Sequence, residues 1–289
     1  MNLFVFGLGY SALHLVRSRR DRFARVAGTV RSAAKATALR AEGTEAFIFG
    51  PDGADPAIPE ALRDADAVLV SIAPDADGDP TLAAYAGALA AARPRWIGYL
   101  STVGVYGDHG GAWVDEATPP RPVSRRSRER VAAEEAWARF GRENGLAVHV
   151  FRLAGIYGPG RNALENLAKG RAKRLIKPGQ VFNRIHVEDI ARAVMASLER
   201  PRAGAVYNLA DDEPAPPQDV VAHAARLAGV PPPPEQPWET ADLTPMARSF
   251  YGENKRVSNR LLREELGVAL AYPTYREALA ALRAAGEGP

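Results

Sequence analysis

The sequence predicts an α/β fold, a doubly wound parallel sheet with a smaller C-terminal lobe. Short apolar stretches alternate with longer amphipathic ones from the first residues onward, which is the pattern of a parallel sheet covered by helices. The 289 residues are enough for one large α/β domain and an additional lobe. A hydrophobic fraction of 46% and a charged fraction of 25% are ordinary for a globular protein.

Apolar runs bounded by polar, glycine or proline residues mark the expected strands. Six runs in the first 155 residues are expected to form the sheet: 3–6, 25–30, 46–49, 67–73, 96–100 and 147–153. An alanine-rich helix is expected at 82–93. Later elements are expected strands at 183–187 and 205–209, a helix at 188–198, and partly helical structure over 155–177. The proline-dense stretch 231–237 is expected to lack regular structure, and two short helices are expected around Pro273 within 243–285.

A glycine-rich turn follows the first expected strand directly. Residues 7–12 read Gly-Leu-Gly-Tyr-Ser-Ala, which fits the dinucleotide-binding pattern G-x-G-x-x-G/A. Gly7 permits a tight turn, Gly9 lets a pyrophosphate approach the backbone, and Ala12 lets the following helix pack on the strand. The N–H groups and dipole at the start of that helix suit an anion. Such a turn can serve packing alone, but its place between a strand and an amphipathic stretch favours cofactor binding by Gly7, Gly9, Tyr10, Ser11 and Ala12.

The end of the second expected strand indicates which dinucleotide binds. An acidic residue there would bind the adenosine ribose hydroxyls and favour NAD. The sequence has no acidic residue from 26 to 39 and offers Thr29, Arg31 and Lys35 instead. An arginine can pair with the 2′-phosphate of NADP through two parallel hydrogen bonds. We therefore expect NADP rather than NAD, bound by Thr29, Arg31 and Ala73 at strand ends, although Arg31 and Lys35 could also be ordinary surface charges.

Composition excludes several classes of function. The formal net charge is only +3 and no dense Lys/Arg tract is present, so nucleic acid is not an expected partner despite a pI of 9.2. The chain has no cysteine, which excludes disulfides and thiolate catalysis, and its five histidines lack metal-binding spacing, so no metal is expected. No apolar run reaches membrane-spanning length and no signal peptide is recognised, so we expect a cytoplasmic protein without a membrane partner.

Six sequence blocks together resemble one enzyme family. They are GLGYSA from Gly7, LSTVGVYG from Leu100, FRLAGIYGPG from Phe151, RIHVEDIARAV from Arg184, YNLADDEP from Tyr207 and NKRVSN from Asn254. In this order they are similar to the extended short-chain dehydrogenase/reductases, the NAD(P)-dependent epimerase/dehydratase family that acts on nucleotide sugars and related substrates. The resemblance implies a Rossmann domain over 1–155, to which 183–210 return, and a mainly substrate-binding lobe over 156–289. It also implies that helices around 82–93 and 131–144 could form a homodimer interface.

In that family a Ser or Thr, a Tyr and a Lys carry the chemistry. The tyrosine transfers the proton, the lysine holds the cofactor ribose and lowers the tyrosine pKa, and the Ser or Thr orients the substrate oxygen. Thr102 stands at the Ser/Thr position. The family's lysine-to-glutamate spacing places Arg126 and Arg130 at the Tyr and Lys positions, and a register shifted by two residues gives Ser124 and Arg128. No tyrosine or lysine occurs from 107 to 156, so the sequence lacks the Tyr-x-x-x-Lys pair in either register.

The residues at these positions allow more than one interpretation. Arginine stays protonated at any working pH, so Arg126 cannot donate and accept a proton as a phenol does. Arg126 could clamp an anionic substrate and Arg130 could hold the ribose or a phosphate, or both could belong to a solvated basic helix face. Tyr106 could supply a proton but is more typical of a packing residue. His109 is the best titrating group on the following loop, unless it is simply exposed.

The later blocks supply the expected substrate contacts. Tyr157, Arg161 and Arg256 are expected to contact the substrate, although Tyr157 could equally be a packing aromatic. Lys255 and Arg256 could meet a negatively charged substrate or simply cap the lobe surface. His186 is expected to be structural, bonded within a strand-to-helix turn.

Two functions are compatible with these patterns. The first is an atypical NADP(H)-dependent oxidoreductase or epimerase with a substituted proton donor, acting on a small molecule that is anionic or nucleotide-linked. The second is a non-catalytic NADP(H)-binding sensor or regulatory protein, because the cofactor turn is present while the Tyr-Lys pair is lacking.

Overall fold

The computed structural model describes the backbone of residues 1–289 and the side chains of residues 1–245 and 247–289. Its largest sheet has eight strands in the order β12-β8-β6-β5-β1-β2-β3-β4. In chain order these strands are β1 (Asn2–Phe6), β2 (Arg25–Val30), β3 (Glu45–Gly50), β4 (Gly53–Ala54), β5 (Ala67–Val70), β6 (Trp96–Thr102), β8 (Val148–Leu153) and β12 (Ala205–Leu209). The mostly parallel Rossmann sheet predicted from the sequence is confirmed.

Strand register brings four carboxyl ends to one edge of the sheet. Leu3 of β1 pairs in parallel with Val26 of β2 on one side and Ala67 of β5 on the other, and Ala67 pairs with Trp96 of β6. β3 continues the parallel order beside β2, and the short β4 pairs antiparallel with β3. The turns after β1, β2, β5 and β6 therefore open on the same edge, which is where open α/β sheets bind ligands.

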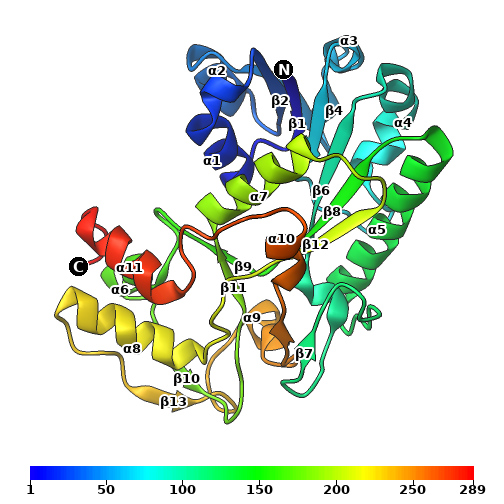
Figure 1. The fold of residues 1–289 in the computed structure, drawn as a ribbon. Coiled ribbons are helices and arrows are strands. Elements are labelled where there is room, and N and C mark those ends of the chain that lie inside the picture. Colours follow the sequence, from blue (N-terminus) through cyan, green and yellow to red (C-terminus); the bar gives the residue numbers. More distant parts are fainter. The chain divides into compact units, whose positions relative to one another are not determined.

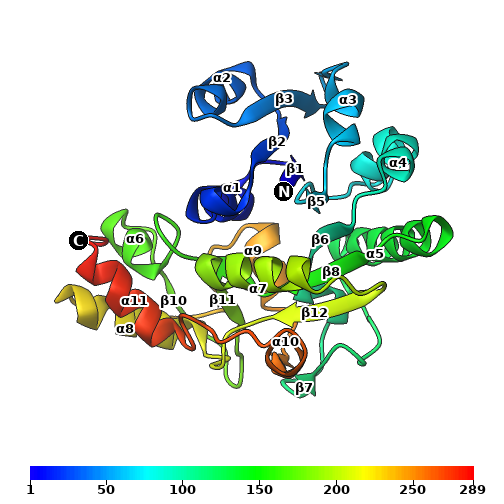
Figure 2. The same ribbon diagram turned by 45° about the horizontal axis from the view of Figure 1, so that its top comes forward.

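Helices cover both faces of this sheet. They are α1 (Tyr10–Ser18), α2 (Ala33–Ala41), α3 (Ile58–Arg63), α4 (Pro80–Ala92), α5 (Arg125–Asn144) and α7 (Val187–Glu199), with 3-10 turns at Arg20–Arg22 and Val103–Tyr106. Figure 2 shows α1 and α7 on one face and α4 and α5 on the other. Side chains alternate along a strand, so Phe4 and Phe6 point together into the core formed with Tyr85 of α4 and Trp137 of α5. The sheet is thus doubly wound.

The chain divides into two compact units. The first contains residues 1–102, 125–152 and 190–207, and the second contains 103–124, 153–189 and 208–289. The sheet's strands come mainly from the first unit. The prediction had instead assigned the whole of 1–155 to the dinucleotide-binding domain, including the segment 103–124.

The second unit consists of short strand pairs and helices. Its strands are β7 (Trp113–Val114), β9 (Gly155–Tyr157), β10 (Arg174–Ile176), β11 (Arg184–His186), β13 (Glu235–Pro237) and β14 (Arg256–Val257), paired as β7-β14, β9-β11 and β10-β13. Its helices are α6 (Ala163–Ala168), α8 (Pro217–Ala228), α9 (Pro245–Phe250), α10 (Arg260–Glu264) and α11 (Tyr275–Ala284). Figure 1 shows α6, α8 and α11 grouped together, where Leu164, Val220, Tyr275 and Leu279 share one buried core.

Three predictions of secondary structure differ most from the structure in extent or number. β5 ends at Val70 rather than residue 73, because after the bond from Ser71 N to Phe6 O the chain turns away and Ile72 packs against Gly7. The stretch 231–237 contains a strand, β13, since a proline is tolerated at the edge of a two-stranded sheet. Residues 243–285 hold three helices instead of two, because Thr244 caps an additional helix that begins with Pro245.

No helix in the described part of the chain is both long enough and apolar enough to cross a membrane.

Candidate functional site

The glycine turn between β1 and α1 has the geometry that its sequence predicts. Gly7 has a φ of +89°, a conformation that residues with a side chain rarely adopt. A Cβ at Gly7 would also lie 2.9 Å from the Ile72 side chain. A Cβ at Gly9 would meet only the Gly7 carbonyl oxygen, at 3.9 Å, so the space beside Gly9 is open. Gly7 therefore shapes the turn, and Gly9 leaves room for a ligand against the backbone.

The start of α1 is suited to an anion. Gly9 is the N-cap residue, and as a glycine it has no side chain that could cap the first helical N–H groups. Ser11 and Ala12 are buried against the sheet, which brings the helix close to β1, while Tyr10 is half-buried. Exposed N–H groups and the positive end of a helix dipole together stabilise a phosphate. The residues present thus fit the pyrophosphate of a dinucleotide.

Hydrogen bonds with residues of β2 and α2 fix the glycine turn. Gly7 N donates to Thr29 Oγ1 at 2.9 Å and Leu8 N donates to Thr29 O at 2.8 Å. Lys35 Nζ, from the first turn of α2, donates to Leu8 O at 2.7 Å. Thr29 is only 1% exposed, so the predicted cofactor contact at Thr29 is instead a support for the turn.

Two exposed residues follow β2 at the same edge of the sheet. Arg31 is exposed, and its Cγ lies 3.3 Å from the position that a Cβ at Gly50 would take. Ser32 is the N-cap of α2 and accepts a hydrogen bond from Lys35 N at 3.4 Å. Gly50 thus leaves room for the Arg31 side chain at the end of β3.

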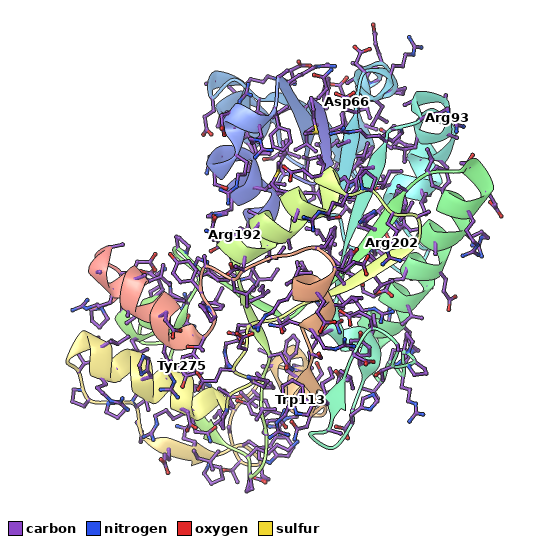
Figure 3. The ribbon with its side chains drawn as sticks, viewed as in Figure 1. Asp66, Arg93, Trp113, Arg192, Arg202 and Tyr275 are labelled. Carbon is purple, nitrogen blue, oxygen red and sulfur yellow. The ribbon has the colours of Figure 1, made fainter. Side chains whose placement is uncertain are left out.

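Ala73 and Thr102 complete the edge in the first unit. Ala73 is exposed in the segment that follows β5, and Thr102 is the half-buried last residue of β6. Figure 3 labels Asp66 and Arg93, which precede β5 and β6 at the amino-terminal edge of the sheet, opposite this site. The parallel register therefore brings the glycine turn after β1, Ala73 after β5 and the predicted catalytic residue Thr102 at the end of β6 to one edge.

Helix α5 carries the two arginines that stand at the family's Tyr and Lys positions. Arg126 is exposed in its first turn. Arg130 is half-buried and its Nη1 donates to Leu100 O at 2.7 Å and to Tyr99 Oη at 3.1 Å. The ring of Tyr99 is fully buried, and this burial raises the pKa of its phenol well above the usual value. Arg130 is thus bonded to the end of β6, and Tyr99 is excluded as an accessible proton donor.

A buried ion pair one turn further along α5 was not singled out from the sequence as a site. Glu134 accepts a hydrogen bond from Ser101 Oγ at 2.5 Å and pairs with Arg152 at 2.8 Å. All three side chains are buried. They join α5 to β6 and β8 and so fix the helix beside Thr102. The sequence indicated this pair only by the position of Glu134, a charged residue on the face of α5 that packs against the sheet.

In the second unit, the aromatic and histidine candidates are engaged in packing. Tyr106 is fully buried and its Oη donates to Asn208 Oδ1 at 2.8 Å. Tyr157 is buried, with its ring perpendicular to that of His186 at 5.3 Å. His186 Nδ1 accepts from Glu188 N at 3.2 Å, which is the structural role expected for it. These contacts favour packing roles for Tyr106 and Tyr157.

The charged candidates of the second unit have different environments. Lys255 is buried, and its Nζ donates to Gly107 O and pairs with Glu253, both at 2.7 Å. The interpretation of Lys255 as a residue that caps the lobe surface is therefore wrong. Arg256 is half-buried and bonds to Gly111 O. Arg161 is exposed. His109 is half-buried with Nε2 3.1 Å from Tyr106 O. Arg161 and His109 thus remain candidates for contact with a substrate.

Comparison with known proteins agrees with this geometry. A model of the NAD dependent epimerase/dehydratase family matches residues 78–210. A functionally unknown conserved protein from Silicibacter pomeroyi DSS, with a solved structure, is 52% identical, with 99% of each chain covered and a TM-score of 0.90. Protein YeeZ of Escherichia coli (strain K12) is 29% identical, with 93% of this chain and 95% of YeeZ covered. The UDP-glucuronic acid 4-epimerase of Bacillus cereus, solved with NAD, is 17% identical with a TM-score of 0.77 over 97% of each chain, a likeness of fold alone.

Proposed function

Because the chain belongs to the NAD-dependent epimerase/dehydratase family, we propose that it is an NADP(H)-dependent oxidoreductase or epimerase with a substituted proton donor. The geometry of the glycine turn carries this proposal. Gly7 has the positive φ that the turn needs, the space beside Gly9 is open, and the N-cap of α1 is a glycine without a capping side chain. These are the features that a dinucleotide pyrophosphate requires.

The choice of NADP(H) over NAD(H) rests on the residues that follow β2. Arg31 is exposed at the carboxyl end of that strand, beside the exposed N-cap Ser32. A guanidinium and a hydroxyl group suit a 2′-phosphate, whereas the carboxylate that would bind two ribose hydroxyls is lacking between 26 and 39. In this proposal Arg31 binds the 2′-phosphate of NADP(H).

The reaction needs both a hydride and a proton. When bound, the nicotinamide supplies or accepts the hydride, a step common to reduction and epimerisation. Thr102, at the end of β6, orients the substrate oxygen through its hydroxyl group. The guanidinium of Arg126 does not release its proton at working pH, so in this proposal the proton comes from a group other than Arg126. The substrate class is a small carbonyl or alcohol compound, anionic or nucleotide-linked.

Turnover of NADPH tests this function. The protein is mixed with NADPH and a panel of carbonyl and sugar-nucleotide compounds, and nicotinamide absorbance is followed with and without each compound. We expect substrate-dependent oxidation with at least one compound, and its loss in Thr102→Val with NADPH affinity unchanged. Tight NADPH binding without turnover on any compound would contradict the proposed catalysis.

A second function, non-catalytic NADP(H) binding, is favoured by the contacts of Arg130. Its Nη1 is engaged with Leu100 O and Tyr99 Oη, whereas the family lysine at this position holds the ribose. A sensor of this kind would distinguish oxidised from reduced cofactor. Equal affinity for NADP⁺ and NADPH, with no change in hydrodynamic shape on binding either one, would exclude the sensor.

A further inference from the structure

Leu8, between the two glycines of the turn, is fixed through three separate groups. Its N–H donates to Thr29 O at 2.8 Å and its carbonyl accepts from Lys35 Nζ at 2.7 Å. Its side chain is only 1% exposed and packs over Gly28, where an added Cβ would come within 3.0 Å of the Leu8 side chain. The orientation of both flanking peptide groups therefore depends on β2 and on Lys35.

We propose that Lys35 is a positioning residue that holds the glycine turn in the conformation that binds a dinucleotide. This inference rests on the proposed binding of NADP(H). The start of α1 must face the pyrophosphate, and the Leu8–Gly9 peptide leads directly into that helix. This peptide is held on both sides, because its carbonyl oxygen accepts from the Lys35 ammonium and its N–H donates to Gly7 O at 2.7 Å. A charged donor makes a stronger hydrogen bond than a neutral one, so this contact keeps the peptide from rotating.

This role differs from the ordinary interpretation of a lysine near Arg31. A lysine that bound the 2′-phosphate would discriminate NADPH from NADH. Lys35 instead acts on the turn, which faces the pyrophosphate that both cofactors share. Removing the Lys35 ammonium should therefore lower the affinities for NADPH and NADH by the same factor. Removing the Arg31 guanidinium should lower only the affinity for NADPH.

Two substitutions of Lys35 separate these possibilities. Lys35→Met keeps the aliphatic stem but removes the donor, and Lys35→Arg restores a cationic donor. In equilibrium titrations of the whole protein, we expect Lys35→Met to lower the affinities for NADPH and for NADH equally, by roughly tenfold. This factor corresponds to about 1.4 kcal/mol of binding free energy. Lys35→Arg should recover much of this loss for both.

A variant of the same helix provides the matched control. Arg40, near the end of α2, also donates from its side chain to a backbone carbonyl, that of Ala46, at 2.5 Å. Arg40→Met removes a comparable contact away from the glycine turn. It should lower thermal stability about as much as Lys35→Met and leave both affinities unchanged.

Amide hydrogen exchange tests the bond without any cofactor. In the cofactor-free protein, Lys35→Met should speed exchange at Gly7, Leu8 and Gly9, and Lys35→Arg and Arg40→Met should not. If Lys35→Met lost affinity for NADPH alone, Lys35 would be a ligand of the 2′-phosphate and the inference would be overturned. Unchanged affinity of this variant for both cofactors would also overturn it. Failure of the wild type to bind either dinucleotide would instead overturn the proposed function itself.

Discussion

Single residues at the end of β2 decide the cofactor in this account. Arg31 is exposed, so Arg31→Ala removes a charge without disturbing the core. If Arg31 pairs with the 2′-phosphate, this variant should bind NADPH roughly ten- to a hundredfold more weakly, and its affinity for NADH should be unchanged. Arg63→Ala, which removes an exposed arginine at the end of α3, is the matched control and should alter neither affinity. Equal wild-type affinities for NADPH and NADH would contradict the role of Arg31.

A buried carboxyl group in the second unit makes stability depend on pH. Burial raises the pKa of Asp211 from 3.8 to about 8, although the nearby charge of Arg184 opposes that shift. Asp211 Oδ1 accepts from Glu213 N at 3.3 Å, and Oδ2 has no hydrogen-bond partner among the described residues. The negative charges of Glu213 and Asp189 also disfavour ionisation. The folded protein therefore holds this proton at neutral pH.

The sign of the pH dependence follows from proton binding. Between about pH 4 and 8 the unfolded state has released this proton and the folded state has not, so the contribution of Asp211 to stability falls as pH rises, by up to about 1.4 kcal/mol per pH unit. Asp211→Asn should abolish that slope and become progressively more stable than wild type up to pH 8. Urea unfolding from pH 5 to 9 measures this, with the exposed Asp242→Asn as control. Parallel pH profiles for wild type and Asp211→Asn would contradict the shift.

At the scale of elements, the ion pair on α5 holds that helix beside the end of β6. Glu134→Ala leaves Arg152 buried without its carboxylate, which should cost about 3–5 kcal/mol of unfolding free energy. Glu135→Ala removes an exposed carboxylate from the next position of the same helix and should cost less than about 0.5 kcal/mol. Denaturant unfolding of both variants makes the comparison. Similar losses would mean that the buried pair does not anchor α5.

Elements differed in how far the sequence predicted them. The strands at 25–30 and 205–209 were predicted with their full extent, because short, mainly apolar stretches of this length are typical of buried strands. β13 was missed because its pairing with β10 lies far away in sequence and overrides local proline content. The hydrogen bond from Lys35 to Leu8 O could not be predicted either, because the residues next to a lysine in the first turn of a helix do not indicate its tertiary partner.

At the scale of the whole molecule, the segment 103–124 is the longest stretch in which the predicted domains and the two compact units differ. After β6 the chain enters the second unit for residues 103–124, and β7 in this segment pairs with β14, where Trp113 opposes Arg256. It then returns to the first unit as α5. Local periodicity indicates strands and helices but not this long-range pairing, so the sequence predicted that the whole of 1–155 belongs to the dinucleotide-binding domain, to which 183–210 return.

The central claim is that the glycine turn of the first unit binds a nicotinamide dinucleotide. Calorimetric titration of the wild type and Gly9→Val with NADPH tests it most directly. The φ of −88° at Gly9 suits valine and its surroundings are open, so the variant should keep its fold while the added side chain fills the pyrophosphate position. The account predicts one NADPH per wild-type chain and at least a tenfold loss of affinity in Gly9→Val. No binding to the wild type, or equal binding to both proteins, would contradict it.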